Sequence, residues 1–269
     1  MHLDPLVILG ITLSAVVYWR GTRAVRLETW RVWSFYAGLL VIAAALISPL
    51  ATLAEQLFLA HMIQHLLLIM VGVPLMLLGA PSVPLARGLP REIRTVYFVP
   101  LARSRFVHAI ARLLRNPIVA LGTYVVLLTA WHVPPLYDAA VENAVIHALE
   151  HFTFIAIAIV FWLQVIDPLP FRSPLSYPLR IVYLFVATAH NTALGGILAF
   201  ADPTLYPYYA NLVTRPFGVS AGFDEQAGGA IMWVPGGMVH LIAISFAFAA
   251  WLNAEDRADV SSRALPDHV

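Results

Sequence analysis

Residues 58–79 read FLAHMIQHLLLIMVGVPLMLLG and include no Asp, Glu, Lys or Arg. A run of this length and apolar character can cross the hydrocarbon core of a bilayer as a helix. Its two histidines, His61 and His65, are four residues apart and therefore share one face of that helix. Because imidazoles inside a membrane are rare and usually functional, the stretch predicts a membrane-spanning helix that carries a site.

The composition of the whole chain supports a membrane protein. Of 269 residues, 60% are hydrophobic and only 12% are charged, and the mean hydropathy is +0.79. A soluble domain of this length does not need so much apolar surface, so we expect a polytopic membrane protein surrounded by lipid. The absence of cysteine excludes disulfides and thiolate metal ligands. We expect no nucleic-acid partner.

Seven apolar stretches are expected to form transmembrane helices of one all-α domain that occupies residues 1–269. They cover residues 3–19, 32–48, 58–79, 117–131, 145–166, 179–200 and 229–251. The N-terminus has neither a basic segment nor a small-residue cleavage motif, so we expect the first stretch to be retained rather than cleaved as a signal peptide.

The arginine residues predict the orientation of this bundle. They gather in alternate connections, at residues 20–31, 87–115 and 172–180 and in the tail at 257–263, and only Arg215 falls on the other side. By the positive-inside rule, the N-terminus is then outside and the C-terminus is cytoplasmic. The arginine spacing at residues 105–115 suits an amphipathic helix on anionic headgroups, although an ordinary cytoplasmic loop explains it as well.

An outer tier of histidines is predicted near the external surface. At a rise of ~1.5 Å per residue, His61 and His65 lie about 5 and 10 Å below the outer edge. His147 and His151, in a span that also enters from outside, lie about 3 and 9 Å below it. His132, at the outer end of the fourth span, lies close to the same plane. Two pairs at one depth predict a metal site if their helices are neighbours.

Two deeper histidines form an inner tier, because His190 and His240 lie about 15 and 16 Å from the outer edge. Without thiolates, the available ligands are imidazole, carboxylate and thioether groups such as Met62, and this set suits copper or zinc. The alternative is that each histidine only hydrogen-bonds a neighbouring helix and stabilises the bundle.

Glu150 lies between the histidines of the second pair and allows further interpretations. The string His147-x-x-Glu150-His151 matches the inverted zinc-protease signature, in which the glutamate is the general base. Glu150 could instead neutralise a bound cation or orient an imidazole. Facing histidines on two helices could also clamp a transmembrane b-type haem.

Several strings, taken together over residues 60–241, resemble the seven-helix CtaG family of cytochrome c oxidase assembly factors. They are His61-Met62-Ile63-Gln64-His65-Leu66-Leu67, Pro74 with Gly79-Ala80-Pro81, His147-x-x-x-His151, Trp162, Asp167-Pro168-Leu169-Pro170, His190-Asn191-x-x-Leu194-Gly195, Phe200-Ala201-Asp202, Leu205-Tyr206-Pro207, Asp224-x-Gln226 and Gly229-x-x-Met232-Trp233-Val234-Pro235-Gly236-Gly237. The resemblance implies a multi-pass protein of the bacterial inner (plasma) membrane that assists assembly of caa-type oxidases, at the copper insertion step. It implies a non-catalytic role, with oxidase subunits and a periplasmic copper chaperone as partners.

The resulting hypothesis is an assembly factor that takes up copper at its outer face. The residues expected to bind the metal are His61, His65, His147, His151, His190 and His240. Asp224 and Gln226 are expected to guard the entrance, with Glu150, His132 and Met62 close by. Helices are expected to pack closely or to break at Gly195-Gly196 and Pro235-Gly236-Gly237. A haem carrier, a copper permease and a metal-free scaffold are the rival functions.

Overall fold

The computed structural model describes residues 5–263, and within that range it describes all side chains except those of residues 258 and 260–263. Every regular element in this part of the chain is helical. In chain order the elements are α1 (Pro5–Thr22), α2 (Thr29–Ile47), α3 (Pro49–Ala54), α4 (Phe58–Leu66), the π-helix η1 (Leu67–Gly72), α5 (Val73–Leu78), α6 (Ser82–Gly88), α7 (Arg91–Ile93), the π-helix η2 (Arg94–Phe98), α8 (Val99–Arg103), α9 (Arg105–Leu114), α10 (Pro117–Trp131), α11 (Pro134–Glu142), α12 (Ala144–Trp162), α13 (Tyr177–Ala199), α14 (Pro207–Ala210), the 3₁₀-helix η3 (Pro216–Gly218) and α15 (Ala221–Arg263).

Six helical segments of the described chain are long and apolar enough to cross a membrane. They are α1, α2, the continuous segment Phe58–Leu78, α12, α13 and α15. The fourth predicted span, α10, has only 15 residues, and it passes the same test only together with α9, from which it is bent by 80°. The span count is therefore six, or seven if this bent pair crosses as one unit. The first predicted span began at residues 3–4, which lie outside the described part.

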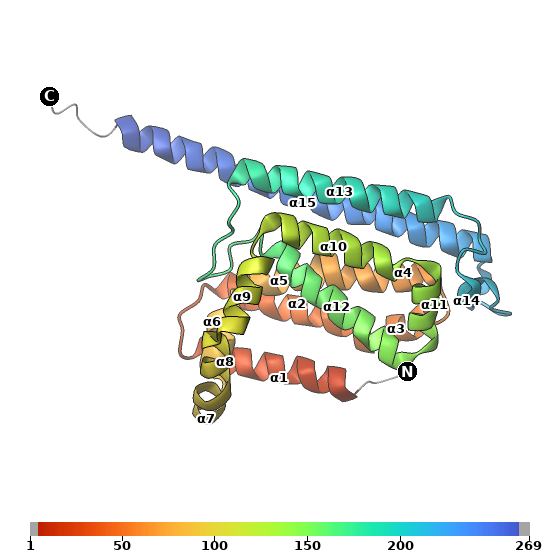
Figure 1. Cartoon of the computed structure of the whole chain (residues 1–269), viewed down its shortest axis with the longest axis horizontal. Helices are drawn as coiled ribbons and strands as arrows, with labels where there is room; N and C mark the ends of the chain where they lie inside the picture. The colour runs from red at the N-terminus through yellow and green to blue at the C-terminus, as the bar shows by residue number, and fades with distance from the viewer. Residues whose placement is uncertain (1–4, 264–269) are drawn as a thin grey trace.

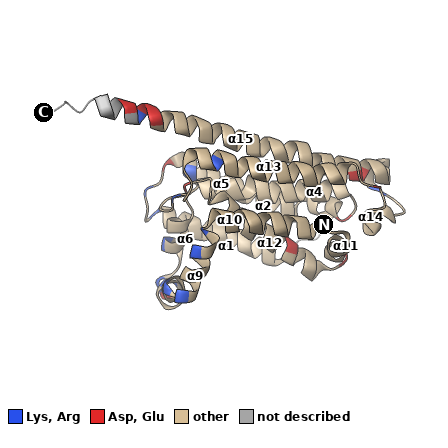
Figure 2. Ribbon diagram, turned by 45° about the horizontal axis from the view of Figure 1, so that its top comes forward, with Lys and Arg blue, Asp and Glu red and all other residues tan. Residues whose placement is uncertain are grey.

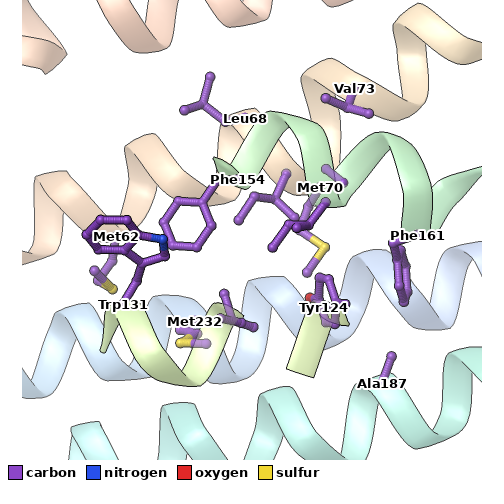
Figure 3. Packing of buried hydrophobic residues seen from close by; sticks show 14 of the residues in the cluster. Met62, Leu68, Met70, Val73, Tyr124, Trp131, Phe154, Phe161, Ala187 and Met232 are labelled. Atoms are coloured by element: carbon purple, nitrogen blue, oxygen red, sulfur yellow. The ribbon is translucent and has the colours of Figure 1, made fainter. Parts of the chain in front are cut away.

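The helices form one elongated bundle (Figure 1). α13 and α15 pack against each other along one flank, and α15 also contacts α4. α12 packs against α10, α11 and α5, while α1 packs against α2 and α6 on the other flank. The largest apolar core lies between these layers and includes Met62, Leu68, Trp131, Phe154 and Met232 (Figure 3).

The span that carries the first histidine pair contains a π-helical turn at its centre. Pro74 lies just after this turn and has no N–H to donate, so a regular helix would leave an acceptor free here. The indole Nε1 of Trp162 on α12 donates to the carbonyl oxygen of Ile69 in this turn at 2.8 Å. This bond satisfies a buried backbone group and ties α12 to the span containing α4, so it helps keep the two histidine-bearing helices side by side.

At Pro235-Gly236-Gly237 the structure has close packing and no break. α15 continues as one helix through Pro235, and an added Cβ at Gly236 would approach the side-chain amide nitrogen of Asn191 on α13 to 2.8 Å. The expectation of close packing is met at Gly195, where an added Cβ would approach the backbone nitrogen of Trp233 on α15 to 2.6 Å. Gly196 and Gly237 have open space at the same position. A small residue is therefore needed only at the first glycine of the Gly195-Gly196 pair.

Basic side chains collect at one end of the bundle, around α6 and α9 (Figure 2). In α9, Arg105 and Arg112 accompany exposed Phe106 and Leu113, and the helix is strongly amphipathic. The residues near the start of α12 and α4 lie toward the opposite end, beside α14 and α11 (Figures 1 and 2). The distribution of arginine agrees with the alternate-loop pattern in the sequence.

Candidate metal centre

Each of the two histidine pairs begins within the first turns of a helix whose start is fixed by a side-chain acceptor. At α12, the Asn143 side chain accepts hydrogen bonds from the backbone N–H groups of Val145 at 2.9 Å and Ile146 at 3.2 Å. At α4, the capping side chain comes from far along the chain. The two carboxylate oxygens of Asp224 accept from the N–H groups of Phe58 and Leu59, each at 2.9 Å. These caps set where each helix begins and therefore where the pairs stand.

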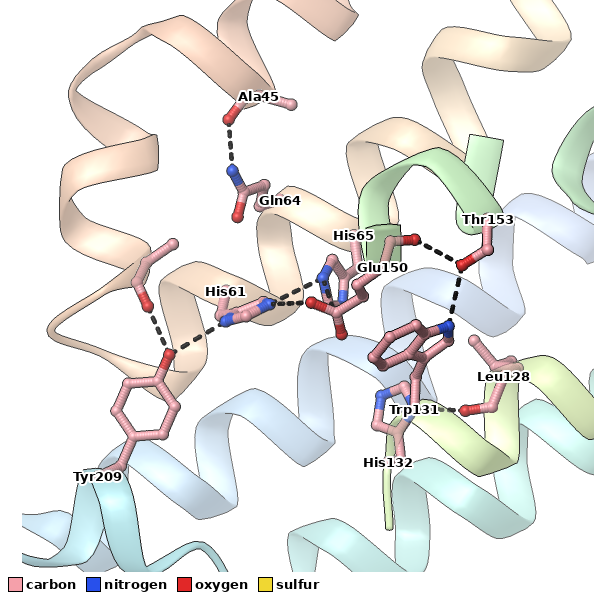
Figure 4. A network of polar contacts seen from close by, with 11 residues as sticks. Ala45, His61, Gln64, His65, Leu128, Trp131, His132, Glu150, Thr153 and Tyr209 are labelled. Carbon is pink, nitrogen blue, oxygen red and sulfur yellow. Dashed lines mark hydrogen bonds and ion pairs between the residues drawn. The ribbon is translucent and has the colours of Figure 1, made fainter. Parts of the chain in front are cut away.

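The two pairs meet, which is the condition that the predicted metal site required. Figure 4 shows Glu150 beside His61 and His65. The ring centroids of His61 and His147 are 5.2 Å apart, and those of His65 and His151 are 5.6 Å apart. Glu150 extends between the pairs, with one carboxylate oxygen 3.5 Å from Nε2 of His61 and the other 3.7 Å from Nε2 of His65. We call these five residues, His61, His65, His147, Glu150 and His151, the histidine–glutamate cluster.

The cluster has the donor set of a metal site. Within it, ligand atoms of His61, His147, Glu150 and His151 all lie within 4.8 Å of one another. Nitrogen and carboxylate ligands bind zinc-like ions at about 2.0–2.2 Å, so small side-chain rotations would bring the four atoms around one ion. Three imidazoles and one carboxylate suit Cu²⁺ or Zn²⁺ rather than Mg²⁺ or Ca²⁺.

Burial strengthens this interpretation. As whole residues, His61 and Glu150 are 0% exposed. Both Glu150 oxygens and the Nε2 atoms of His147 and His151 are buried without a hydrogen-bond partner. Buried polar groups of native proteins are almost always paired, and an isolated buried carboxylate is costly. A cation held among these atoms would satisfy all of them together.

Tyr209, on α14, fixes the tautomer of His61. Its phenol oxygen donates to the carbonyl oxygen of Ala54 at 2.5 Å and lies 3.1 Å from Nδ1 of His61. Because its single proton is used on Ala54, the phenol accepts from Nδ1–H of His61, which places the lone pair of that ring on Nε2, the nitrogen that faces the cluster. Burial raises the pKa of Tyr209 well above its usual range, so the phenol stays protonated.

The sequence analysis missed Tyr209 as part of the site. No tyrosine of the loop that carries it was given a part in the predicted site. Instead, both Tyr206 and Tyr209 are buried, and the Tyr209 ring is 5.9 Å from that of Phe58. The i,i+3 spacing of these tyrosines, which places them on one face of a short helix, was the one available signal.

His132 and His190 lie near the cluster but outside it. His132 ends α10, and its ring is 6.5 Å from that of His65. Its Nδ1 donates to the carbonyl oxygen of Leu128 at 2.6 Å, and its Nε2 is buried and unpaired. The Nε2 atom of His190 lies 2.9 Å from the hydroxyl of Thr129 on α10. His190 therefore has a helix-bridging contact of the kind expected of a stabilising histidine.

His240 is separated from the other histidines. It is fully buried on α15, with ring centroids 5.7 Å from Phe161 and 6.0 Å from Trp162. These aromatic residues lie 10 and 11 positions after His151 on α12, which corresponds to about 15 Å along a helix. The structure thus does not join His190 and His240 into one inner tier.

Asp224 and Gln226, the residues expected to guard an entrance, do not lie together at an opening of the cluster. The carboxylate of Asp224 is occupied by the backbone of α4, so it positions a helix, and Gln226 is exposed on α15. Met62 is buried in the core beside the cluster rather than within it. Asp224 caps α4 and does not face an entrance, because two N–H groups without a partner at the start of a helix bind a nearby carboxylate strongly.

Comparison with known proteins finds related chains in mycobacteria. An uncharacterized protein of Mycobacterium leprae is 26% identical over 249 residues, which are 87% of this chain and 36% of the relative. Uncharacterized proteins of Mycobacterium bovis and Mycobacterium tuberculosis are each 27% identical over 271 residues, covering 94% of this chain and 39% of the relative. The chain therefore spans less than two fifths of the length of these relatives. No solved structure matches it.

A family model matches residues 14–254, which include all five residues of the histidine–glutamate cluster. The family is described as cytochrome c oxidase caa3 assembly factor, in agreement with the resemblance seen in the sequence motifs. The matched region extends from α1 into the second half of α15 and covers nearly all of the described helices. The chain therefore belongs to the Caa3_CtaG family of cytochrome c oxidase caa3 assembly factors.

Proposed function

We propose that this membrane protein binds a copper ion in the histidine–glutamate cluster and passes it to a haem-copper oxidase during assembly of that enzyme. One observation carries the proposal, namely the convergence of four ligand atoms from α4 and α12, three of them on side chains whose buried atoms have no hydrogen-bond partner. Copper is the cargo here, and the protein supplies the ligands that hold it. The role is non-catalytic, since membership of the assembly-factor family accounts for the protein without a reaction of its own.

The proposal includes an orientation. The basic residues of α6–α9 lie at the end of the bundle away from the start of α12, and by the positive-inside rule that end is cytoplasmic. The N-terminus and the histidine–glutamate cluster are then on the periplasmic side of a bacterial inner membrane. Copper would arrive from a periplasmic chaperone and leave toward an oxidase subunit without crossing the bilayer.

The metal content of purified protein tests this proposal. The wild type should retain copper after removal of loosely bound ions, and a His61→Ala, His147→Ala double variant should lose it, because the double variant removes one ligand from each helix. His108→Ala is the matched control, since His108 is exposed on α9, outside the cluster. Equal copper stoichiometry in the wild type and the double variant would contradict the proposal, and a haem Soret band would support the b-type haem alternative instead.

A further inference from the structure

A second group of metal-ligating side chains lines a small cavity directly beside the histidine–glutamate cluster. Its wall includes three thioethers, Met62, Met70 and Met232, and two imidazoles, His65 and His132. These residues come from α4, η1, α15 and the end of α10, so four segments of the chain converge on it. Figure 3 shows the three methionine side chains within the apolar core. The cavity holds about 30 Å³, which is sufficient for one water molecule or one ion.

Both imidazoles of this cavity have a buried ring nitrogen without a partner. For His132 it is Nε2, because Nδ1–H donates to the carbonyl oxygen of Leu128, so Nε2 carries the lone pair. For His65 it is Nδ1. Apart from these two imidazoles and Asn191, the wall is apolar. A buried acceptor without a partner needs one, and the thioethers that line the same cavity favour a soft cation.

The tautomer of His65 follows from that of His61. Since Nδ1–H of His61 is used on Tyr209, the 2.8 Å contact between Nε2 of His61 and Nε2 of His65 takes its proton from His65. His65 therefore carries its lone pair on Nδ1, away from the cluster. When a metal binds Nε2 of His65, the proton must move to Nδ1, so this ring can serve one site at a time.

We propose that the cavity is a second cation site, selective for a soft monovalent ion such as Cu⁺, and that His65 is shared between it and the histidine–glutamate cluster. Thioether and imidazole ligands suit Cu⁺, whereas imidazole and carboxylate ligands suit Cu²⁺. Each site takes up its own ion, Cu⁺ in the cavity and Cu²⁺ in the cluster, and neither ion changes its oxidation state. Occupation of the cavity rests on these residues alone, and only a part of the cavity in copper delivery rests on the proposed function.

Two probes distinguish the sites in the purified full-length protein. Ag⁺, a redox-inert soft monovalent ion, reports on the cavity, and Cu²⁺ reports on the cluster. In a Met62→Leu, Met232→Leu double variant, Ag⁺ affinity should fall at least about tenfold, since loss of even an outer partner typically weakens metal binding by roughly 10–100-fold. Cu²⁺ binding should be unchanged, because the cluster keeps all its ligands. Met238→Leu is the matched control, since Met238 is 55% exposed on α15.

The cluster variant His147→Ala should give the reverse result, with weakened Cu²⁺ binding and preserved Ag⁺ binding. Ag⁺ affinity equal to wild type in the double methionine variant would overturn the second site while leaving the proposed function intact. Unchanged Cu²⁺ affinity in His147→Ala would instead count against the proposed function. X-ray absorption of wild-type protein loaded with Ag⁺ needs no variant, and should show sulfur ligands; a shell of nitrogen and oxygen alone would overturn the second site.

Discussion

The phenol oxygen of Tyr209 lies 3.1 Å from Nδ1 of His61 and thereby determines which nitrogen of that histidine faces the histidine–glutamate cluster. The two residues are 148 positions apart in the chain. The connection between α13 and α15 thus supplies an orienting partner for a ligand on α4. Such partners fix the ring and raise its basicity as a ligand.

Tyr209→Phe should weaken copper binding by roughly 10–100-fold, because it removes the acceptor that holds the His61 tautomer. The ring remains, so the packing against Phe58 should persist. Competition with a copper chelator would measure the change. Tyr208→Phe is the control, since its hydroxyl donates to the carbonyl oxygen of Glu55 at 3.1 Å and takes no part in the cluster. Equal losses in both variants would show that the effect is not specific to His61.

Glu150→Gln should leave the metal-free protein at least as stable as the wild type, because it removes a buried carboxylate that has no hydrogen bond. Copper should then stabilise this variant much less. At a free copper concentration of 100 Kd, the wild type should gain about 2.7 kcal/mol. Thermal unfolding with and without copper measures both effects, and a variant that kept the full copper-induced shift would show that Glu150 is not a ligand.

Asp224→Ala should destabilise the fold by about 0.5–2 kcal/mol, the range found when a helix loses its N-terminal cap. The reason is that two N–H groups at the start of α4 lose their acceptor. Denaturation in detergent would measure this change. Gln226→Ala is the control, because Gln226 is exposed on α15, the helix that also carries Asp224, and this change should affect stability little. If the Asp224 variant lost copper uptake without losing stability, the residue would act at an entrance, as the sequence analysis expected.

Sequence periodicity placed each histidine pair on one helix face at a similar depth, and it left open whether the two helices are neighbours. Residues four apart share a helix face, and both pairs begin close to the start of helices that enter the bundle at the same end. Local spacing therefore predicted the shared helix face and the similar depth of His61 with His65 and of His147 with His151. The identity of the ion and the ligand roles of these residues stay predictions.

Periodicity could not predict partners that come from elsewhere in the chain. The contacts of Tyr209 with His61 and of Asp224 with Phe58 join residues 148 and 166 positions apart. Sequence also left open whether helices pack closely or break at Pro235-Gly236-Gly237, and the structure has close packing, because a proline inside a membrane helix can be accommodated by neighbouring segments. The inner tier of His190 and His240 was predicted from their depth in the membrane alone. Depth does not show which face of a helix points inward, so the sequence could not show that these two histidines have different neighbours.

Gly195→Ala should destabilise the packing of α13 on α15 by about 1–3 kcal/mol, the usual cost of overfilling a close contact. A Cβ at this position would lie 2.6 Å from the backbone nitrogen of Trp233. Gly196→Ala is a matched control, because a Cβ there would meet nothing within 4 Å and alanine favours a helix by about 0.5–1 kcal/mol. Unfolding midpoints of the two variants should therefore move in opposite directions, and a common direction would contradict the packing described for α13 and α15.

Side chains from α4 and α12 are proposed to coordinate one copper ion together. X-ray absorption at the copper edge of the loaded wild-type protein tests it most directly, because it counts imidazole ligands around the metal. The expected result for protein loaded with Cu²⁺ is a copper ion with at least three imidazole ligands and an oxygen ligand, which loses one imidazole in His151→Ala. A copper ion with one imidazole or none, or a ligand shell that His151→Ala leaves unchanged, would contradict the claim.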